Sequence, residues 1–225
     1  MTNKRRISNF CRSTSNVKIL LLISLILLVS CSRLEKTAPI AFSKVRTILN
    51  DAEKFGEPFG IAVKEDEKFF SDGETGKIWR LSNNRDFAVV TDKLHTPSAI
   101  AFDKNGDLIV ADSGTHTVKK VKIETGEIEL IAGIENQKGY VDGDAKSALF
   151  NAPIGIAVLE DKIFVADTYN DKIRVVENGR VATLAGSEQG FADAENGLAA
   201  KFDTPCGLAI WENKLIVADT GNNRL

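Results

Sequence analysis

The sequence predicts an all-β fold, a β-propeller of four-stranded blades. Three observations predict it. One sequence pattern recurs in four copies along the chain, at intervals of about 40 to 55 residues. Each complete copy contains four short runs of β-branched or apolar residues. Gly, Asn and Asp residues flank these runs, as they flank strands that are joined by tight turns.

The first strand of each copy begins at a proline, where the missing backbone N–H costs a sheet least. Small and large side chains then alternate, so that Gly60 and Ala62 point to one face while Ile61 and Val63 point to the other. We expect the small side chains to let a neighbouring blade pack closely. The four strands are Pro58–Val63, Pro97–Phe102, Pro153–Val158 and Pro205–Ile210.

The second strand of each copy ends in an aspartate, 14 or 15 residues after the proline. Since this carboxylate lies where the chain turns, we expect it to accept backbone N–H groups and fix the turn. A ring of cation-binding carboxylates is the alternative. We favour the structural role, because a catalytic site is usually built from unlike residues. The aspartates are Asp72, Asp112, Asp167 and Asp219.

A third strand starts six residues after each aspartate, and a fourth follows in the first three copies. Long connectors precede the third and fourth copies, at residues 133–152 and 186–204. They resemble each other, as in Lys138-Gly-Tyr-Val-Asp142 and Gln189-Gly-Phe-Ala-Asp193. We expect a short helical turn in each connector.

The first thirty residues differ from the rest of the chain. They hold five basic and no acidic side chains, and they contain the eleven-residue apolar stretch Ile19–Val29. This length suits the core of a signal peptide, whereas a helix that spans a bilayer needs about 20 apolar residues. Residues 1–30 are therefore predicted to be an export signal.

The end of this stretch, Leu28-Val29-Ser30-Cys31, resembles the bacterial lipobox. The resemblance implies that Cys31 carries the lipid and becomes the first residue of the mature protein, with residues 31–44 as a tether. Several acyl chains on one cysteine give stable membrane attachment. We therefore expect a lipid-anchored protein of the bacterial cell envelope, facing the periplasm or the cell surface. A plain signal peptide or an uncleaved anchor is the alternative.

Charge and cysteine content exclude several classes of protein. The whole chain has a net charge of -2, but the 195 residues after the signal hold 24 basic and 31 acidic groups, a net charge of -7. This argues against a nucleic-acid partner, which a basic field would attract. Cys11 lies in the signal and Cys31 is the lipid site, so Cys206 has no internal partner for a disulfide.

The pattern P-x-G-I-A-V, then V-A-D-T, then N-x-R resembles the NHL repeat over residues 58–225. The third and fourth copies match best. The first copy departs at Ser71-Asp72-Gly73, and the second departs at Ala99 and His116. The resemblance implies a propeller, commonly of six blades, that most often serves to bind other molecules.

The strands do not complete a ring of blades. Val45–Leu49 resembles a fourth strand without its own first three. The propeller is therefore expected over residues 45–225, as one outer strand, three full blades and the first two strands of another. We expect the chain to be a fragment of a longer one. A compact ring of four blades, closed by residues 45–49, is the alternative.

Candidate catalytic and metal-binding residues are few. The two histidines, His95 and His116, fall in loops, and no His-x-x-x-His, CxxC, G-x-S-x-G or glycine-rich phosphate motif occurs. Cys206 lies at a variable position of a first strand, and we expect it to be buried and inert. The sequence thus predicts no catalytic residue, no metal site and no cofactor.

Three kinds of function remain. The favoured one is a lipid-anchored scaffold that binds an envelope protein or glycan through its loops. The alternative is a propeller enzyme of lyase or lactonase type, with a central-channel metal whose ligands are partly missing from this chain. The third is a structural module of a larger envelope assembly. Because a fold does not select among these, the ligand stays unidentified.

Overall fold

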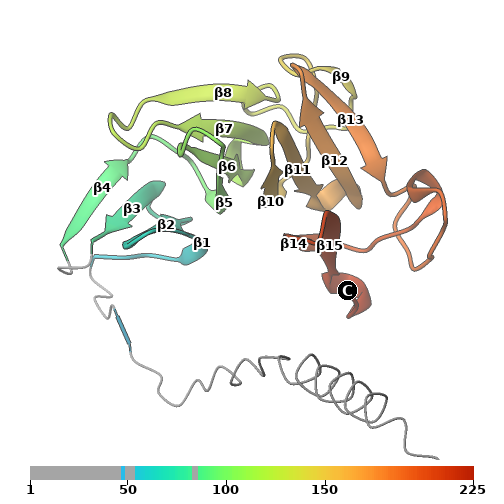
Figure 1. Ribbon diagram of the computed structural model, residues 1–225. Helices are drawn as coiled ribbons and strands as arrows, with labels where there is room; N and C mark the ends of the chain where they lie inside the picture. The colour runs from blue at the N-terminus through green and yellow to red at the C-terminus, as the bar shows by residue number, and fades with distance from the viewer. Residues whose placement is uncertain (1–46, 49–53, 83–85) are drawn as a thin grey trace, which may run out of the picture. The chain divides into compact units, whose positions relative to one another are not determined.

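A computed structural model describes residues 47–48, 54–82 and 86–225 (Figure 1). The predicted signal peptide, the Cys31 lipidation site and the tether lie outside these residues. Of the predicted outer strand Val45–Leu49, only residues 47 and 48 are described, and neither is in a strand. The blades lie within one compact unit, residues 50–225.

The described residues form two four-stranded antiparallel sheets, one five-stranded antiparallel sheet and a further pair of strands. Each of the three larger sheets contains the four-stranded blade that the sequence predicts. Blade 1 contains β1 (Pro58–Lys64), β2 (Glu67–Asp72), β3 (Lys77–Leu81) and β4 (Phe87–Thr91). Blade 2 contains β5 (Pro97–Phe102), β6 (Leu108–Asp112), β7 (Thr117–Val121) and β8 (Ile128–Ala132). Blade 3 contains β10 (Pro153–Leu159), β11 (Lys162–Asp167), β12 (Lys172–Glu177) and β13 (Arg180–Ala185). Blade 4 contains β14 (Pro205–Trp211) and β15 (Lys214–Asp219).

The connector before blade 3 adds a strand that the sequence did not predict. β9 (Gly143–Asp144) pairs with the outer edge of β13. The expected short turn follows it, with the Ala148 N–H donating to the Asp144 carbonyl at 2.8 Å. In the connector before blade 4 the turn is the 3₁₀ helix η3 (Gly197–Ala199).

Every blade begins with the same irregularity. The proline pairs with the aspartate that ends the second strand, and a register shift follows before the regular ladder starts. A proline cannot donate to the ladder, so a bulge next to it leaves the remaining pairs in register. The start of the first strand and the end of the second therefore lie together at one end of each blade.

The blades stack through their first strands, which lie on the inner side of the arc in Figure 1. Small side chains of one strand face the next blade. A Cβ placed on Gly60 would lie 2.5 Å from the Ser98 carbonyl oxygen, and one on Gly155 would collide with the Cys206 carbonyl. The large alternate side chains face the preceding blade, and Ile100 and Ile156 are each 5% exposed there. The predicted role of the small residues is thereby confirmed.

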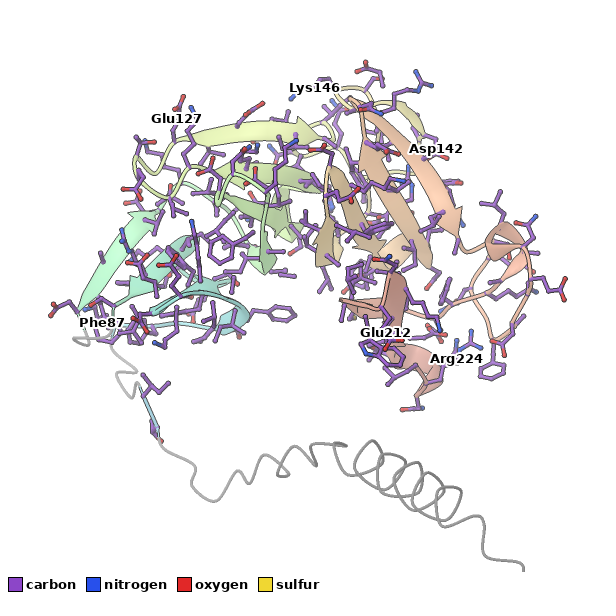
Figure 2. The ribbon with its side chains drawn as sticks, viewed as in Figure 1. Phe87, Glu127, Asp142, Lys146, Glu212 and Arg224 are labelled. Carbon is purple, nitrogen blue, oxygen red and sulfur yellow. The ribbon has the colours of Figure 1, made fainter. Side chains whose placement is uncertain are left out.

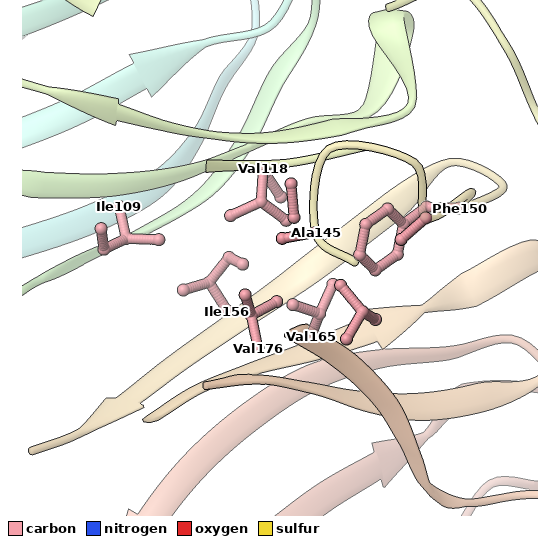
Figure 3. Packing of buried hydrophobic residues seen from close by; sticks show 11 residues of the cluster. Ile109, Val118, Ala145, Phe150, Ile156, Val165 and Val176 are labelled. Atoms are coloured by element: carbon pink, nitrogen blue, oxygen red, sulfur yellow. The ribbon is translucent and has the colours of Figure 1, made fainter. Parts of the chain in front are cut away.

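Among the described residues, two apolar cores lie between blades. One joins blades 1 and 2 around Phe69, Ile100 and Val110. The other joins blades 2 and 3 around Ile109 and Phe150, and Figure 3 shows its side chains meeting from both blades. Since each core takes residues from two blades, a blade depends on its neighbours for burial.

Gly155→Ala is expected to lower the free energy of unfolding by about 1 to 3 kcal/mol, because its methyl group meets a backbone carbonyl that cannot move without separating two blades. Gly73→Ala is the matched control. A Cβ there finds its nearest neighbours at 3.7 Å, so the change should be close to neutral. Urea unfolding of both variants measures the difference. Equal stability of the two variants would contradict the packing described here.

Candidate functional site

One end of the blades carries the longest loops and the most varied side chains. Here the turn after each second strand meets the loop before the first strand, because the proline and the aspartate pair in the ladder. We call this end the loop face. Its segments are residues 54–57 and 73–76 in blade 1, 92–96 and 113–116 in blade 2, 133–152 and 168–171 in blade 3, and 186–204 and 220–223 in blade 4.

Each turn on the loop face closes on a residue in the left-handed backbone conformation, four positions after the aspartate. In blades 2 to 4 the turn is a 3₁₀ helix: η1 (Ser113–Thr115), η2 (Thr168–Asn170) and η4 (Thr220–Asn222). Glycine, asparagine, aspartate and histidine adopt this conformation more readily than other residue types. The residues are Gly76, His116, Asp171 and Asn223, with φ between 52° and 67°.

The repeat aspartates hold the loop face together. All four side chains are at most 1% exposed. Each accepts backbone N–H groups from the loop before its own proline, with N···O distances of 2.7 to 3.3 Å. The donors are Gly56 and Glu57 for Asp72, His95 and Thr96 for Asp112, Asn151 for Asp167, and Asp203 for Asp219.

The same carboxylates also bind the turn that follows them. Asp72 accepts from the backbone of Thr75, and Asp112 accepts from the Thr115 hydroxyl. Asp167 and Asp219 each accept from an asparagine side chain three residues on. The sequence predicts that each aspartate fixes its own turn. The structure shows a wider role, in which the aspartate joins that turn to a loop about sixteen residues earlier.

A third partner lies seven residues after the aspartate, on the third strand, and the sequence analysis missed it. The Trp79 indole N–H donates to Asp72 at 3.4 Å, and the Lys119 ammonium lies 2.9 Å from Asp112. The residue type changes from blade to blade, which hides the position in a pattern search. Only its constant spacing could have revealed it. In blade 3 this partner is Arg174.

Arg174 is the centre of a buried network in blade 3. Its side chain is fully buried, and its guanidinium lies 2.7 Å from Asp167 and 2.5 Å from Asp142. It also donates to the carbonyls of Val141 and Leu149, so one side chain binds the connector at several points. Asp142 in turn accepts from the backbone of Thr183 on β13, and Figure 2 shows it beside that strand.

In blades 1 and 3, an aromatic side chain three residues before the proline packs against this partner. Phe55 lies edge-on to Trp79 with ring centroids 5.0 Å apart, and the Phe150 ring lies 5.1 Å from the Arg174 guanidinium carbon. Leu94 holds the same position in blade 2 and is buried. In blades 1 and 3 the loop before the first strand is thus fixed twice, by an aromatic side chain and by the aspartate.

The aspartates differ in how easily they ionise. Burial alone would raise the pKa of Asp72, but its hydrogen bonds from Gly56 and Thr75 outweigh burial and hold the pKa below the ordinary value. The pKa of Asp219 is also lowered, because hydrogen bonds from Asn222, Asp203 and Arg224 outweigh burial. Burial raises the pKa of Asp167 despite its partners. Its hydrogen bonds from Asn170 and Asn151 and the charge of Arg174 favour the ionised form but do not outweigh burial.

On this common frame, the residue two before the proline meets the residue two after the aspartate in every blade, and the side chains of this pair differ from blade to blade. Glu74 lies over Gly56, His95 lies over Gly114, and Asp203 lies over Gly221, each close to where a Cβ of the glycine would be. In blade 3 the Asn151 amide donates to the Tyr169 carbonyl at 3.3 Å. Carboxylate, imidazole, amide and phenol groups therefore occupy corresponding positions in successive blades.

The connectors add exposed aromatic rings to the loop face. Tyr140 is 48% exposed and Phe191 is 66% exposed, at corresponding positions of the two connectors. A cation lies near each ring: the Lys172 ammonium is 4.8 Å from the Tyr140 centroid, and the Arg224 guanidinium carbon is 4.1 Å from that of Phe191. A third ring, Tyr169, is 62% exposed and belongs to the turn 168–171, which lies between the two connectors along the chain.

Three residues that the sequence analysis weighed have structural partners. The His116 ring Nδ1 accepts the Ala152 N–H at 3.0 Å, and burial together with nearby Lys138 lowers the pKa of His116. Asp142, which ends the Lys138–Asp142 motif of the first connector, forms an ion pair with Arg174. Cys206 is half-buried rather than buried as expected, and its Sγ lies 3.3 Å from the Thr204 carbonyl.

Within residues 47–48, 54–82 and 86–225, no three histidine, cysteine, aspartate or glutamate side chains gather closely enough to hold a metal ion. The four repeat aspartates stay in separate blades, each with its own partners. No helix in the described part of the chain has the length and apolar character needed to cross a membrane.

Comparisons of sequence point to the NHL repeat. A family model named NHL repeat matches residues 94–121. NHL repeat-containing protein 2 of Bos taurus is 33% identical over 149 residues, which cover 57% of this chain and 20% of that protein. A probable peptidyl-alpha-hydroxyglycine alpha-amidating lyase of Caenorhabditis elegans is 28% identical over 207 residues, covering 79% of this chain and 57% of that protein. The chain thus spans only part of either relative.

Comparison of structure shows the fold. An auxiliary nutrient binding protein from Bacteroides thetaiotaomicron superimposes with a TM-score of 0.61 at 20% sequence identity, covering 70% of this chain and 44% of that chain. This likeness shows the fold alone, and the NHL repeat model itself matches the segment of blade 2 given above.

Arg174→Met is expected to lower the free energy of unfolding by about 3 to 5 kcal/mol, because it leaves buried Asp167 without its cation. Arg180→Met on β13 is the matched control. Its side chain is exposed, so the change should stay within about 0.5 kcal/mol. Urea unfolding measures both. A loss as small as that of the control would show that Arg174 does not hold the connector.

Proposed function

We propose that the protein is an NHL-type propeller lipoprotein of the bacterial cell envelope, which binds a protein or glycan ligand through its loop face. One observation carries this proposal. In every blade an aspartate at the equivalent position fixes the backbone of the loop face. The side chains that this backbone presents differ from blade to blade. A rigid frame with varied loops is the usual design of a binding surface.

The chemistry of the loop face supports a polar ligand with some apolar surface. Exposed Tyr140, Tyr169 and Phe191 offer flat rings. His95 and Asp203 offer hydrogen-bonding groups on other segments of the loop face. Aromatic rings with a polar atom suit both glycans and protein surfaces, because they contact apolar faces while staying partly hydrated. The nutrient binding protein from Bacteroides shares the fold, so this fold is compatible with such a role.

A lyase or lactonase is the second candidate, and the C. elegans relative named as a probable lyase favours it. In its favour, Glu74, His95, Asn151 and Asp203 are residue types that bind metals. The described residues do not fit a metal centre, since no three such side chains gather in one place. We therefore derive no catalytic step for this chain.

Binding through the loop face can be tested with an array of envelope glycans and with envelope extract as the source of proteins. Tyr169→Ala is expected to weaken binding of any captured ligand by about 10-fold or more, because exposed aromatic side chains often dominate binding energy. Asn105→Ala is the matched control, in the exposed turn at the opposite end of blade 2. Isothermal titration measures both. Equal loss in the two variants, or loss in the control alone, would place the ligand elsewhere.

Lipid anchoring is tested separately. Cys31→Ala is expected to abolish acylation and move the protein from the membrane fraction to the soluble fraction of the envelope. Membrane fractionation followed by mass spectrometry of the N-terminal peptide reports both effects. A Ser32→Ala variant, which keeps the cysteine, should stay with the membrane. If Cys31→Ala also stays there, the lipoprotein assignment is wrong.

A further inference from the structure

The backbone N–H of the residue directly before each proline has two different kinds of acceptor in this chain. In blade 1 the Glu57 N–H donates to the aspartate of its own blade, Asp72, at 3.1 Å. The Thr96 N–H does the same in blade 2, donating to Asp112 at 2.8 Å. In blades 3 and 4 this N–H donates instead to the preceding blade, to the left-handed residue that closes its turn.

The bond between blades accompanies a change in backbone conformation. The Ala152 N–H donates to the His116 ring Nδ1 at 3.0 Å, and the Thr204 N–H donates to the Asp171 carboxylate at 2.8 Å. Both donors have left-handed φ values, 47° for Ala152 and 46° for Thr204, whereas the corresponding residues of blades 1 and 2 do not. Side chains other than glycine disfavour this conformation, so the bond between blades holds a strained backbone in place.

Histidine and aspartate differ as acceptors in this bond. An imidazole nitrogen accepts a hydrogen bond only when it carries no proton, so His116 is neutral here and has its proton on Nε2. When a proton from solvent binds Nδ1, this nitrogen becomes a donor that faces the Ala152 N–H donor. Carboxylates stay ionised through the pH range in which histidines titrate. The bond between blades 2 and 3 is therefore sensitive to pH in a way that the bond between blades 3 and 4 is not.

The surroundings of His116 favour its neutral form. Burial, followed by the charge of Lys138 on the connector, lowers the pKa of His116 below the ordinary value of 6.5, against the opposing charge of Asp167 at the end of β11. Glu135, also on the connector, is paired with Lys119 at 2.7 Å. Because the folded state resists this protonation more than the unfolded chain does, the stability that His116 contributes is present above pH 6.5 and falls as the pH drops below it.

A second acceptor for the Ala152 N–H is already in place. In blade 2 one oxygen, Asp112 Oδ1, accepts both N–H groups that precede the proline. In blade 3 the equivalent oxygen, Asp167 Oδ1, accepts only the Asn151 N–H among the described residues, at 2.7 Å. The two arrangements of this loop, one with the bond between blades and one without it, thus both occur in the same chain.

We propose that His116 is a pH-sensitive latch between blades 2 and 3. Neutral His116 holds the Ala152 N–H and the left-handed backbone that goes with it. When Nδ1 is protonated, the peptide before Ala152 turns and its N–H passes to Asp167, in the arrangement of blades 1 and 2. A switch requires an element with two discrete arrangements, and this loop provides one.

The movement reaches the loop face through Asn151. The Asn151 amide donates to the Tyr169 carbonyl at 3.3 Å, and Tyr169 carries one of the exposed rings. Opening the latch moves Asn151 and so changes the support of Tyr169. The link to ligand binding rests on the proposed function, whereas the latch itself belongs to the chain and is tested without a ligand.

The test is a nuclear magnetic resonance titration of the full chain in mild detergent, from about pH 8 to about pH 5. The ring nitrogen shifts of His116 give its tautomer and its titration midpoint, and the coupling through the hydrogen bond between the Ala152 nitrogen and Nδ1 reports the latch. At the upper pH the proton should be on Nε2 and the coupling present. The coupling should disappear, and the Ala152 amide signal should move, with the midpoint of His116, below 6.5.

Two variants and one internal control complete the test. His116→Asp supplies the carboxylate that Asp171 provides in the next blade, so its Ala152 signal should stay constant over the titration. His95→Asn replaces the other histidine of the chain and should titrate as the wild type does. The Thr204 amide of the wild type should not move, since its acceptor is a carboxylate.

Several results would overturn the latch. They are a proton on Nδ1 at the upper pH, a ring that stays neutral throughout, titration of His116 without any change at Ala152, and an Ala152 signal that still titrates in His116→Asp. Equal movement of Ala152 and Thr204 would also overturn it, because that indicates general loosening of the loop face. If His116→Asp does not fold, the wild-type titration with its Thr204 control decides alone.

Discussion

The hydrogen bonds between each repeat aspartate and the loop before its own proline are the interaction on which the rest of the structure depends. Burying a carboxylate is unfavourable, and a buried carboxylate persists only when donors surround it. Here the donors come from three places: the incoming loop, the following turn and the third strand. A bond from a neutral donor to a charged group contributes about 1.5 to 3 kcal/mol. One side chain therefore holds three segments of the blade together.

The alternation of small and large side chains supplies the second constraint, which acts between blades rather than within them. The large residues of one first strand fill the space left by the small residues of the previous first strand. Each blade is therefore positioned by its neighbour. The two constraints operate at different parts of the strand. Packing fixes the distance between blades, and the aspartates fix the loops at one end, so the loop side chains can vary without disturbing the core.

The sequence was sufficient for the strands, their order and the blades, because these follow from local periodicity and from a proline and an aspartate at constant spacing. It was not sufficient to predict that Arg174 binds the repeat aspartate. The equivalent residues are Trp79 and Lys119, so this position always contacts the aspartate but its residue type changes from blade to blade. The bond between His116 and Ala152 joins residues 36 apart, and no local pattern predicts it. Strand β9 depends likewise on the edge that β13 leaves in space.

Amide hydrogen exchange tests the central role of the aspartates most directly. The amides two residues before each proline lie in loops, outside any strand, yet each donates to a buried carboxylate. If the aspartates hold these loops, all four amides exchange slowly, at rates near those of the strand amides. Exchange at the rate of an unstructured peptide would contradict it. The four amides are those of Gly56, His95, Asn151 and Asp203.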